Sequence, residues 1–292
     1  MQHSRRSFLA LGAAGLAATR LTSATLFARQ APRFKVGVTD WNLRQEALPE
    51  SFALGKKIGF DGVQVSLANG RGAARQPIGA EVVARYRAES QRLGIPITST
   101  CLNILHTNYL KSDPLGPKRV SEGIALTKAI GVEVMLLPFF GDGALKTPAE
   151  MDRVGDLLRE LGPEAQKQGV ILGLEDTISA RDNVRIMERA QSPAVLTYYD
   201  VGNSTVNGHK VVEELRWLGA SRICEVHLKD NPNFMGAGTI DFPAVIDALA
   251  DIGFARWAVL ETSSPSGALE DDLRRNLTFT RDLIAARAKQ AE

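Results

Sequence analysis

From about residue 34 onward, the chain repeats one pattern of hydrophobic and polar positions. Short apolar runs rich in Val, Ile and Leu alternate with longer segments in which apolar residues recur every three or four positions. The short runs predict buried strands and the longer segments predict amphipathic helices. The expected strands are residues 34–40, 62–67, 96–102, 132–140, 170–175, 195–200, 224–230 and 257–261.

Helices are expected between these strands and after the last one. The clearest segments are residues 48–58, 80–93, 118–130, 148–168, 241–252 and 270–288, and a glycine follows most of them, as is common where helices end. Thr147, Pro148 and Glu150 predict a capped helix start. Eight strands in strict alternation with eight helices favour a single-domain α/β fold, the (β/α)8 TIM barrel, over residues 31–292. A doubly wound open sheet is the alternative, but no glycine-rich phosphate loop follows the first strand.

The strand at residues 224–230 has two faces of different chemistry. Val226 and Leu228 lie on one face, and Glu225, His227 and Lys229 lie on the other. Because helices are expected on both sides of this strand in the chain, the apolar face should meet them and the charged face should point into the barrel. Burying three such groups is costly unless they are paired or bind a metal ion. The strand therefore predicts a functional site.

Three further strands end in a carboxylate, at Glu175, Asp200 and Glu261. Parallel strands of a barrel present their carboxyl ends at one rim, so these side chains and His227 should converge there. One imidazole and three carboxylates form an oxygen-rich set that suits one Mn²⁺, Mg²⁺ or Co²⁺ ion, with Zn²⁺ as a further candidate. The sequence thus predicts one divalent metal ion as cofactor.

Such an ion would acidify a C–H bond next to a carbonyl group by stabilising the ene-diolate that forms when the proton leaves. Glu175 and Glu261 come from the two ends of the four-strand arc, so we expect them to act as the acid/base pair as well as ligands. Asp200 and His227 are expected to be ligands only. This chemistry predicts a sugar isomerase or epimerase acting on a small carbohydrate.

Four residues near the expected rim are candidates for contacting substrate. Lys229 shares the inward face with His227, with a salt bridge as the alternative role. Trp41 follows the first strand and is expected to wall a sugar face or to pack in the core. Asn203 follows Asp200 and either contacts substrate or fixes the turn. His106 lies in a long loop after the third strand and would reach the site from there.

The N-terminal residues are expected to form a segment separate from the barrel. Arg5 and Arg6 precede Phe8 and an Ala/Gly-rich apolar run, which predicts a twin-arginine signal peptide over residues 1–30. The apolar run is too short for a stable membrane anchor. The expected location is therefore the periplasm or the medium, reached through the twin-arginine export machinery.

The formal net charge is +2, so the composition gives no reason to expect nucleic-acid binding. The sequence leaves open whether the chain forms a homo-oligomer.

Several short motifs, taken together, resemble one known family. They are Leu-Glu-Asp at 174–176, Asp-Val-Gly-Asn at 200–203, His-Leu-Lys-Asp at 227–230, Gly-Ala-Gly-Thr-Ile-Asp-Phe at 236–242 and Leu-Glu at 260–261. Over about residues 35–283, the chain is similar to the xylose isomerase-like sugar phosphate isomerases and epimerases. The resemblance implies a metal ion bound by Glu175, Asp200, His227 and Glu261, with both glutamates in proton transfer.

The chain departs from the family pattern at two positions. Gln64 stands where the family often has Glu, which we expect to alter the sugar contacts. Asn203 stands where ketose 3-epimerases tend to carry His, which weakens the case for a plain ketose epimerase. Endonuclease IV, a relative with a histidine-rich trinuclear zinc site, is excluded because the whole chain contains four histidines.

Two other functions remain open at this point. The same ene-diolate could expel a leaving group, which would make the protein a lyase or dehydratase acting on keto-sugars or oxidised glycosides. Export favours this reading, since free sugar phosphates are mainly cytoplasmic. A non-enzymatic periplasmic barrel that binds a sugar or a metal ion is the third alternative.

Overall fold

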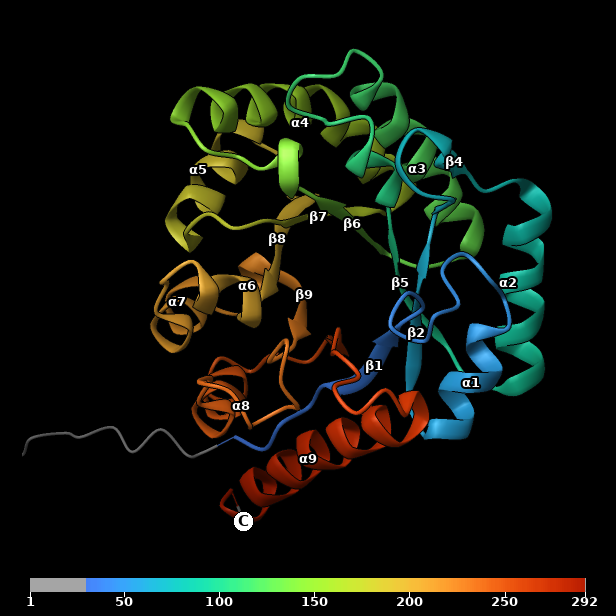
Figure 1. Cartoon of the computed structure of the whole chain (residues 1–292). Helices are drawn as coiled ribbons and strands as arrows, with labels where there is room; N and C mark the ends of the chain where they lie inside the picture. The colour runs from blue at the N-terminus through green and yellow to red at the C-terminus, as the bar shows by residue number, and fades with distance from the viewer. Residues whose placement is uncertain (1–29, 292) are drawn as a thin grey trace, which may run out of the picture.

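A computed structural model describes residues 30–291 of the chain. Eight parallel strands close into a barrel in the order β1-β10-β9-β8-β7-β6-β5-β2, and β1 pairs with both β10 and β2 to complete the ring (Figure 1). The (β/α)8 barrel expected from the sequence is confirmed. The strands are β1 (Lys35–Thr39), β2 (Gly62–Ser66), β5 (Ile97–Cys101), β6 (Val134–Pro138), β7 (Ile171–Glu175), β8 (Val195–Asp200), β9 (Ile223–Leu228) and β10 (Trp257–Leu260).

The helices form an outer ring around this barrel (Figure 1). They are α1 (Ser51–Ile58), α2 (Ala80–Leu93), α3 (Gly116–Ile130), α4 (Pro148–Gln168), α5 (Ala180–Ala190), α6 (Val201–Val206), α7 (Val211–Leu218), α8 (Phe242–Asp251) and α9 (Leu269–Lys289). The expectation of eight helices was wrong, because α6 and α7 both lie between β8 and β9. The expected loop after β2 also holds a small antiparallel hairpin of β3 (Ala68–Asn69) and β4 (Gln76–Pro77).

The ends of α4 show how local sequence sets the helix boundaries. The Thr147 side chain accepts a hydrogen bond from the backbone N–H of Glu150, and the Glu150 carboxylate accepts one from the backbone N–H of Thr147. This reciprocal pair is the predicted capping box, and Pro148 occupies the first turn, where its missing N–H costs nothing. Gly169 ends the helix with φ at 69°, a conformation that other residues adopt only with strain.

The barrel interior is apolar over part of its depth and polar toward the carboxyl ends of the strands. Cys101, Val134, Leu136, Tyr198 and Cys224 form one buried cluster. A second, larger apolar core lies between the strands and the helices and includes Val63, Leu172, Val226 and Leu249. Two packed layers of this kind are what the near-continuous apolar strands require, because both faces of each strand are covered.

The predicted signal over residues 1–30 lies outside the described residues, apart from Gln30. Within residues 30–291, no helix has the length and apolar character needed to cross a bilayer.

Candidate active site at the carboxyl ends of the strands

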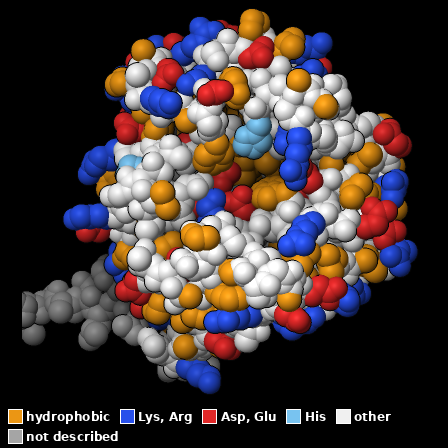
Figure 2. Space-filling model, viewed as in Figure 1, with side chains coloured by type: hydrophobic (Ala, Val, Ile, Leu, Met, Phe, Trp, Pro, Cys, Tyr) orange, Lys and Arg blue, Asp and Glu red, His pale blue; other side chains and the backbone are white. Residues whose placement is uncertain are grey.

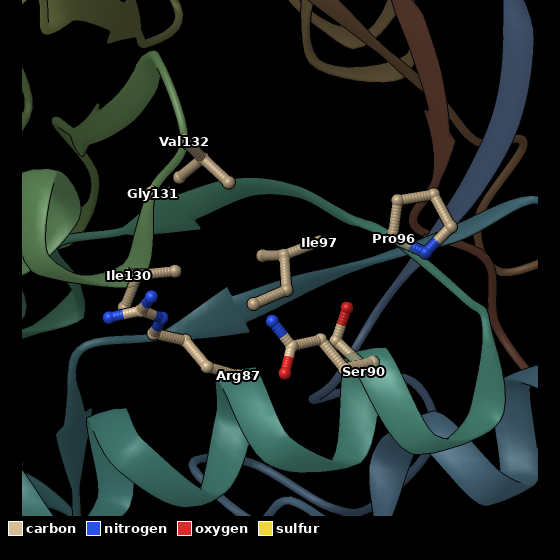
Figure 3. Close-up of a pocket in the computed structure, with 8 residues that line it drawn as sticks. Arg87, Ser90, Pro96, Ile97, Ile130, Gly131 and Val132 are labelled. Carbon is tan, nitrogen blue, oxygen red and sulfur yellow. The ribbon is translucent and has the colours of Figure 1, made fainter.

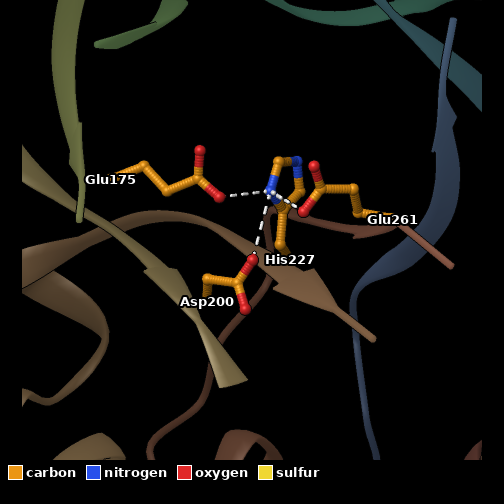
Figure 4. Close-up of side chains that lie close together, drawn as sticks. All are labelled: Glu175, Asp200, His227 and Glu261. Carbon is orange, nitrogen blue, oxygen red and sulfur yellow. Dashed lines mark hydrogen bonds and ion pairs between the residues drawn. The ribbon is translucent and has the colours of Figure 1, made fainter. Parts of the chain in front are cut away.

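Four adjacent strands deliver the four expected ligands to one place. Glu175 and Asp200 are the last residues of β7 and β8, His227 is on β9, and Glu261 directly follows β10. One ligand atom from each of these side chains lies within 4.8 Å of each of the others (Figure 4). Because β7, β8, β9 and β10 are neighbours in the barrel, residues far apart in the sequence become neighbours in space.

His227 is at the centre of this group. Its Nδ1 atom lies 2.8 Å from Glu175 Oε1, 3.7 Å from Asp200 Oδ2 and 3.6 Å from Glu261 Oε2. The imidazole, Glu175 and Asp200 are buried, whereas the Glu261 side chain is 20% exposed. Figure 4 shows the three carboxylates around one ring nitrogen, with Glu175 and Glu261 on opposite sides of the ring. Solvent therefore reaches the group from the Glu261 side.

Lys229 reaches the same carboxylates from the end of β9. Its Nζ atom lies 2.7 Å from Asp200 Oδ2 and 2.5 Å from Glu261 Oε2. Gly202 makes room for this side chain, since a Cβ at residue 202 would lie 2.4 Å from Lys229 Cγ. The salt bridge considered as the alternative role of Lys229 is thus present.

Trp41, which follows β1, contacts two residues of the group. Its indole N–H donates a 2.9 Å hydrogen bond to Glu261 Oε1, and its ring meets that of His227 edge-on at 6.0 Å between centroids. Lys229 and Trp41 therefore hold one carboxylate oxygen of Glu261 each.

Asn203 and His106 are placed differently. The backbone N–H of Asn203 donates to Asp200 Oδ1 at 2.8 Å, so the carboxylate also caps α6. Asn203 Nδ2 is buried, and no described residue accepts a hydrogen bond from it. His106 lies in a short 3-10 turn (Asn103–His106), where its exposed ring stacks on Phe140. The structure does not join His106 to the four-residue group.

The charges of the group depend strongly on burial. Burial raises the pKa of Glu175 to about 7, against the opposing charge of His227. Burial would also raise the pKa of Asp200, but the ammonium of Lys229 and the ring of His227 hold it well below its ordinary value. For His227, the charges of Glu175 and Glu261 outweigh burial and raise its pKa to about 10. The protein without a metal ion therefore carries cations on His227 and Lys229.

The residues present fit a divalent metal ion. Asp200 Oδ2 is buried and lies 2.7 Å from Lys229 Nζ and 3.7 Å from His227 Nδ1, so cationic groups of the protein already face it. Three carboxylates gathered in so small a space are costly to bury unless positive charge offsets theirs. Three carboxylates and one imidazole nitrogen within 4.8 Å could hold one ion, provided that the His227 Nδ1 proton leaves first.

The structure gives Gln64 a position that sequence reasoning did not foresee, and it adds Ser99 and Tyr198 as neighbours. We expected Gln64 to alter sugar contacts, but the structure buries it completely beneath His227, with Oε1 at 2.8 Å from the ring Nε2. Ser99, Tyr198 and Glu225 continue this buried polar network. The available signal was the polar residue in an apolar strand, since buried parallel strands rarely carry unpaired amides.

Two cavities differ in their relation to this group. One of about 430 Å³ lies beside Lys229 and α6 and is lined mainly by amide and hydroxyl side chains, including Asn203, Asn231 and Thr239. Figure 2 shows a hollow in the molecular surface, with acidic side chains inside it and a histidine at its rim. The other cavity, of about 320 Å³, lies between α2 and the start of β5, at the amino ends of the strands (Figure 3). Of these two cavities, the first is lined by Lys229, which contacts the candidate ligands Asp200 and Glu261.

The family model for the xylose isomerase-like TIM barrel matches residues 52–283. The chain belongs to this family. One relative, 2-epi-5-epi-valiolone 7-phosphate 2-epimerase from Actinoplanes sp., is 27% identical over 203 residues, covering 68% of this chain and 73% of the relative.

Solved structures agree with this family assignment at the level of the fold. An L-ribulose 3-epimerase superposes with a TM-score of 0.71 at 17% identity, over 88% of this chain and 97% of the other. A 3-keto-D-glucoside 4-epimerase from E. coli superposes with a TM-score of 0.68 at 19% identity, over 85% of this chain and 99% of the other.

Proposed function

We propose that this protein is a sugar epimerase or isomerase that uses one divalent metal ion and moves a proton at a carbon next to a carbonyl group. The observation that carries the proposal is the convergence of Glu175, Asp200, His227 and Glu261 within 4.8 Å at the carboxyl ends of four adjacent strands. The relatives reported above are named as epimerases, which supports an enzyme rather than a non-enzymatic binding barrel.

The four residues would hold the ion, and Mn²⁺, Mg²⁺ or Co²⁺ suits their oxygen-rich donor set. When bound, the ion supplies Lewis-acid polarisation of a substrate carbonyl and its neighbouring hydroxyl, which acidifies the C–H bond between them. The remaining steps belong to side chains of the chain itself.

Glu175 and Glu261 are the proposed proton carriers. They lie on opposite sides of His227 (Figure 4), so a sugar placed over the group would have one carboxylate near each face. One glutamate removes the proton, and the other returns it to the same or the next carbon. Trp41 and Lys229 each contact one oxygen of Glu261, which fixes the direction of its carboxylate.

The rest of the substrate has room beside this group. The cavity of about 430 Å³ is lined by Lys229, Asn203, Asn231 and Thr239, whose polar side chains match the hydroxyl groups of a carbohydrate. We propose Lys229, Trp41 and Asn203 as substrate contacts. For His106, a contact requires the substrate to extend toward its 3-10 turn.

Proton exchange with solvent is the direct test. Protein loaded with Mn²⁺ is incubated in D₂O with ketoses and with 3-keto-glucosides, and deuterium incorporation is followed by NMR. We expect exchange in the wild type and at least a hundredfold loss in both Glu175→Gln and Glu261→Gln, the range typical of removing a general acid or base. Glu133→Gln is the control, because Glu133 is exposed at the other end of the barrel.

Absence of exchange in folded, metal-loaded wild-type protein across the sugar panel would contradict the proposal. Product analysis separates the remaining alternative: a retained carbon skeleton identifies an epimerase or isomerase, whereas loss of water or of an aglycone identifies a β-eliminating lyase.

A further inference from the structure

The amide of Gln64 lies directly beneath His227, on the side of the ring away from the carboxylates. His227 Nδ1 faces Glu175 Oε1 at 2.8 Å, and Nε2 faces Gln64 Oε1 at 2.8 Å. Both His227 and Gln64 are completely buried. Each ring nitrogen therefore faces a protein group at hydrogen-bond distance.

The neighbouring groups fix which end of the amide meets the ring. Gln64 Nε2 lies 3.0 Å from Ser99 Oγ and 3.1 Å from the Tyr198 hydroxyl. The single hydroxyl hydrogen of Ser99 is donated to Glu225 Oε2 at 2.6 Å. Ser99 then accepts a hydrogen bond from Gln64, which places the NH₂ end of the amide on that side. The carbonyl oxygen of Gln64 is left to face the imidazole.

The hydrogen bonds from His227 through Gln64 and Ser99 to Glu225 all run in one direction, each group donating to the next. A carbonyl oxygen has no hydrogen to give, so the contact with Gln64 Oε1 requires a hydrogen on His227 Nε2. The neutral ring then carries its lone pair on Nδ1, among the three carboxylates. The four groups come from β2, β5 and β9, so the barrel itself holds the arrangement.

We infer that Gln64 is a positioning residue that holds His227 in its Nε2–H tautomer and thereby keeps Nδ1 available as a ligand for the divalent ion. The inference rests on the metal site of the proposed function. It assigns Gln64 a role in metal binding and not in sugar contact, and it explains why an amide is buried beside His227 inside the barrel.

Metal affinity and stability separate positioning from mere packing. Gln64→Met keeps the volume and removes the acceptor, and we expect it to bind Mn²⁺ about 10–100-fold more weakly by titration calorimetry, the usual effect of losing such a partner. Gln64→Glu restores an acceptor and should bring Mn²⁺ affinity back to within about threefold of the wild type.

Thr127→Val is the control. It removes a buried hydroxyl that pairs with Thr100 at 2.7 Å, and neither residue belongs to the hydrogen-bond network of Gln64. We expect this variant to unfold at a lower temperature but to bind Mn²⁺ as the wild type does. A fall in affinity that merely follows the loss of stability across all three variants would show a packing role and overturn the inference.

A spectroscopic measurement on the wild type keeps the inference testable even if Gln64→Met does not fold. In the Mg²⁺-loaded protein with ¹⁵N-labelled histidine, His227 should show a hydrogen on Nε2, with its signals assigned by their loss in His227→Asn. An Nε2 atom without a hydrogen in that spectrum would overturn this inference but leave the proposed function standing. The same holds if Gln64→Met binds Mn²⁺ as tightly as the wild type. Failure of the wild type to bind any divalent ion would overturn the proposed function as well.

Discussion

His227 has different chemistry on its two ring nitrogens, and this difference defines the candidate site. Nδ1 faces three carboxylates and Nε2 faces the amide of Gln64. Sequence reasoning placed His227 on the inward face of its strand because of the alternation in residues 224–230. The partner on the far side of the ring could not be read from that alternation, because Gln64 is 163 residues away in the chain.

Lys229 is predicted to compete with the divalent ion. Its ammonium lies 2.7 Å from Asp200 Oδ2 and 2.5 Å from Glu261 Oε2, which are both candidate ligand oxygens. Lys229→Met removes this internal cation, so we expect Mn²⁺ affinity to rise about tenfold, equivalent to about 1.4 kcal/mol. Two unit charges about 4 Å apart near a protein surface interact by about 4 kcal/mol. The expected change in binding free energy is therefore smaller than the full repulsion between the ammonium and the ion.

Titration calorimetry on metal-free protein would measure this change. Lys111→Met is the control, since Lys111 is an equally buried lysine whose partner, Glu150, lies at the start of α4. Unchanged or weaker Mn²⁺ binding in Lys229→Met would show that the ammonium does not oppose the ion.

At the scale of elements, local sequence rules account for the start of α4 and for the glycines that end α1, α2, α3 and α4. The capped helix start at Thr147, Pro148 and Glu150 was predicted, and the structure shows both hydrogen bonds of a capping box. The split of the β8–β9 connection into α6 and α7 was not predicted. Asp200 caps α6 through the backbone N–H of Asn203, so a residue read as a metal ligand also begins a helix.

The capping box predicts a pH dependence of stability. Hydrogen bonds from Lys111 and from the backbone of Lys146 lower the pKa of Glu150 from 4.5 to about 2. A carboxyl group with a lowered folded-state pKa stabilises the fold above its unfolded pKa and loses this effect as the pH falls through the folded value. At pH 7, Glu150→Gln keeps the capping position but loses the charge paired with Lys111, so it should reduce the free energy of unfolding by about 0.5–1 kcal/mol.

Urea unfolding of wild type and Glu150→Gln from pH 7 to pH 2 would test this prediction. The difference between the two proteins should shrink as the pH falls from about 4.5 to about 2, because the wild-type carboxylate is then protonated. A difference that stays constant across this range would mean that the charge of Glu150 contributes nothing.

At the scale of the whole molecule, α9 connects the end of the ring of helices to its beginning. Figure 1 shows α9 running along the barrel beside α8 and α1. The guanidinium of Arg287, which is 2% exposed, pairs with Asp247 and Asp251 of α8 at 2.8 Å each. Arg281 of the same helix pairs with Asp61, whose other oxygen accepts from the backbone N–H of Val36 in β1. The C-terminal helix is thus tied to the outer ring and to the first strand.

Removing Arg287 should weaken this closure. Arg287→Ala loses two ion pairs and buried packing, so we expect the free energy of unfolding to fall by about 1–3 kcal/mol. The exposed Lys289 of the same helix is the control, and Lys289→Ala should change stability by less than about 0.5 kcal/mol. Equal effects of the two variants in urea unfolding would contradict a role of Arg287 in closing the barrel.

The sequence by itself determined the barrel and the residues of the candidate metal site. Apolar runs alternating with amphipathic segments leave few other ways to bury both faces of eight strands, and carboxyl ends of parallel strands must share a rim. Glu175, Asp200, His227 and Glu261 were named on this ground alone. The export signal over residues 1–30 stays a prediction.

Only the tertiary structure decided how the four residues are supported. Whether His227 Nε2 carries a hydrogen depends on Gln64, Ser99 and Glu225. The orientation of the Glu261 carboxylate depends on Trp41 and Lys229. These partners come from different strands and loops around the barrel, and their contacts depend on strand register. Periodicity along a chain shows which face a side chain takes, but not which side chain it meets across the barrel.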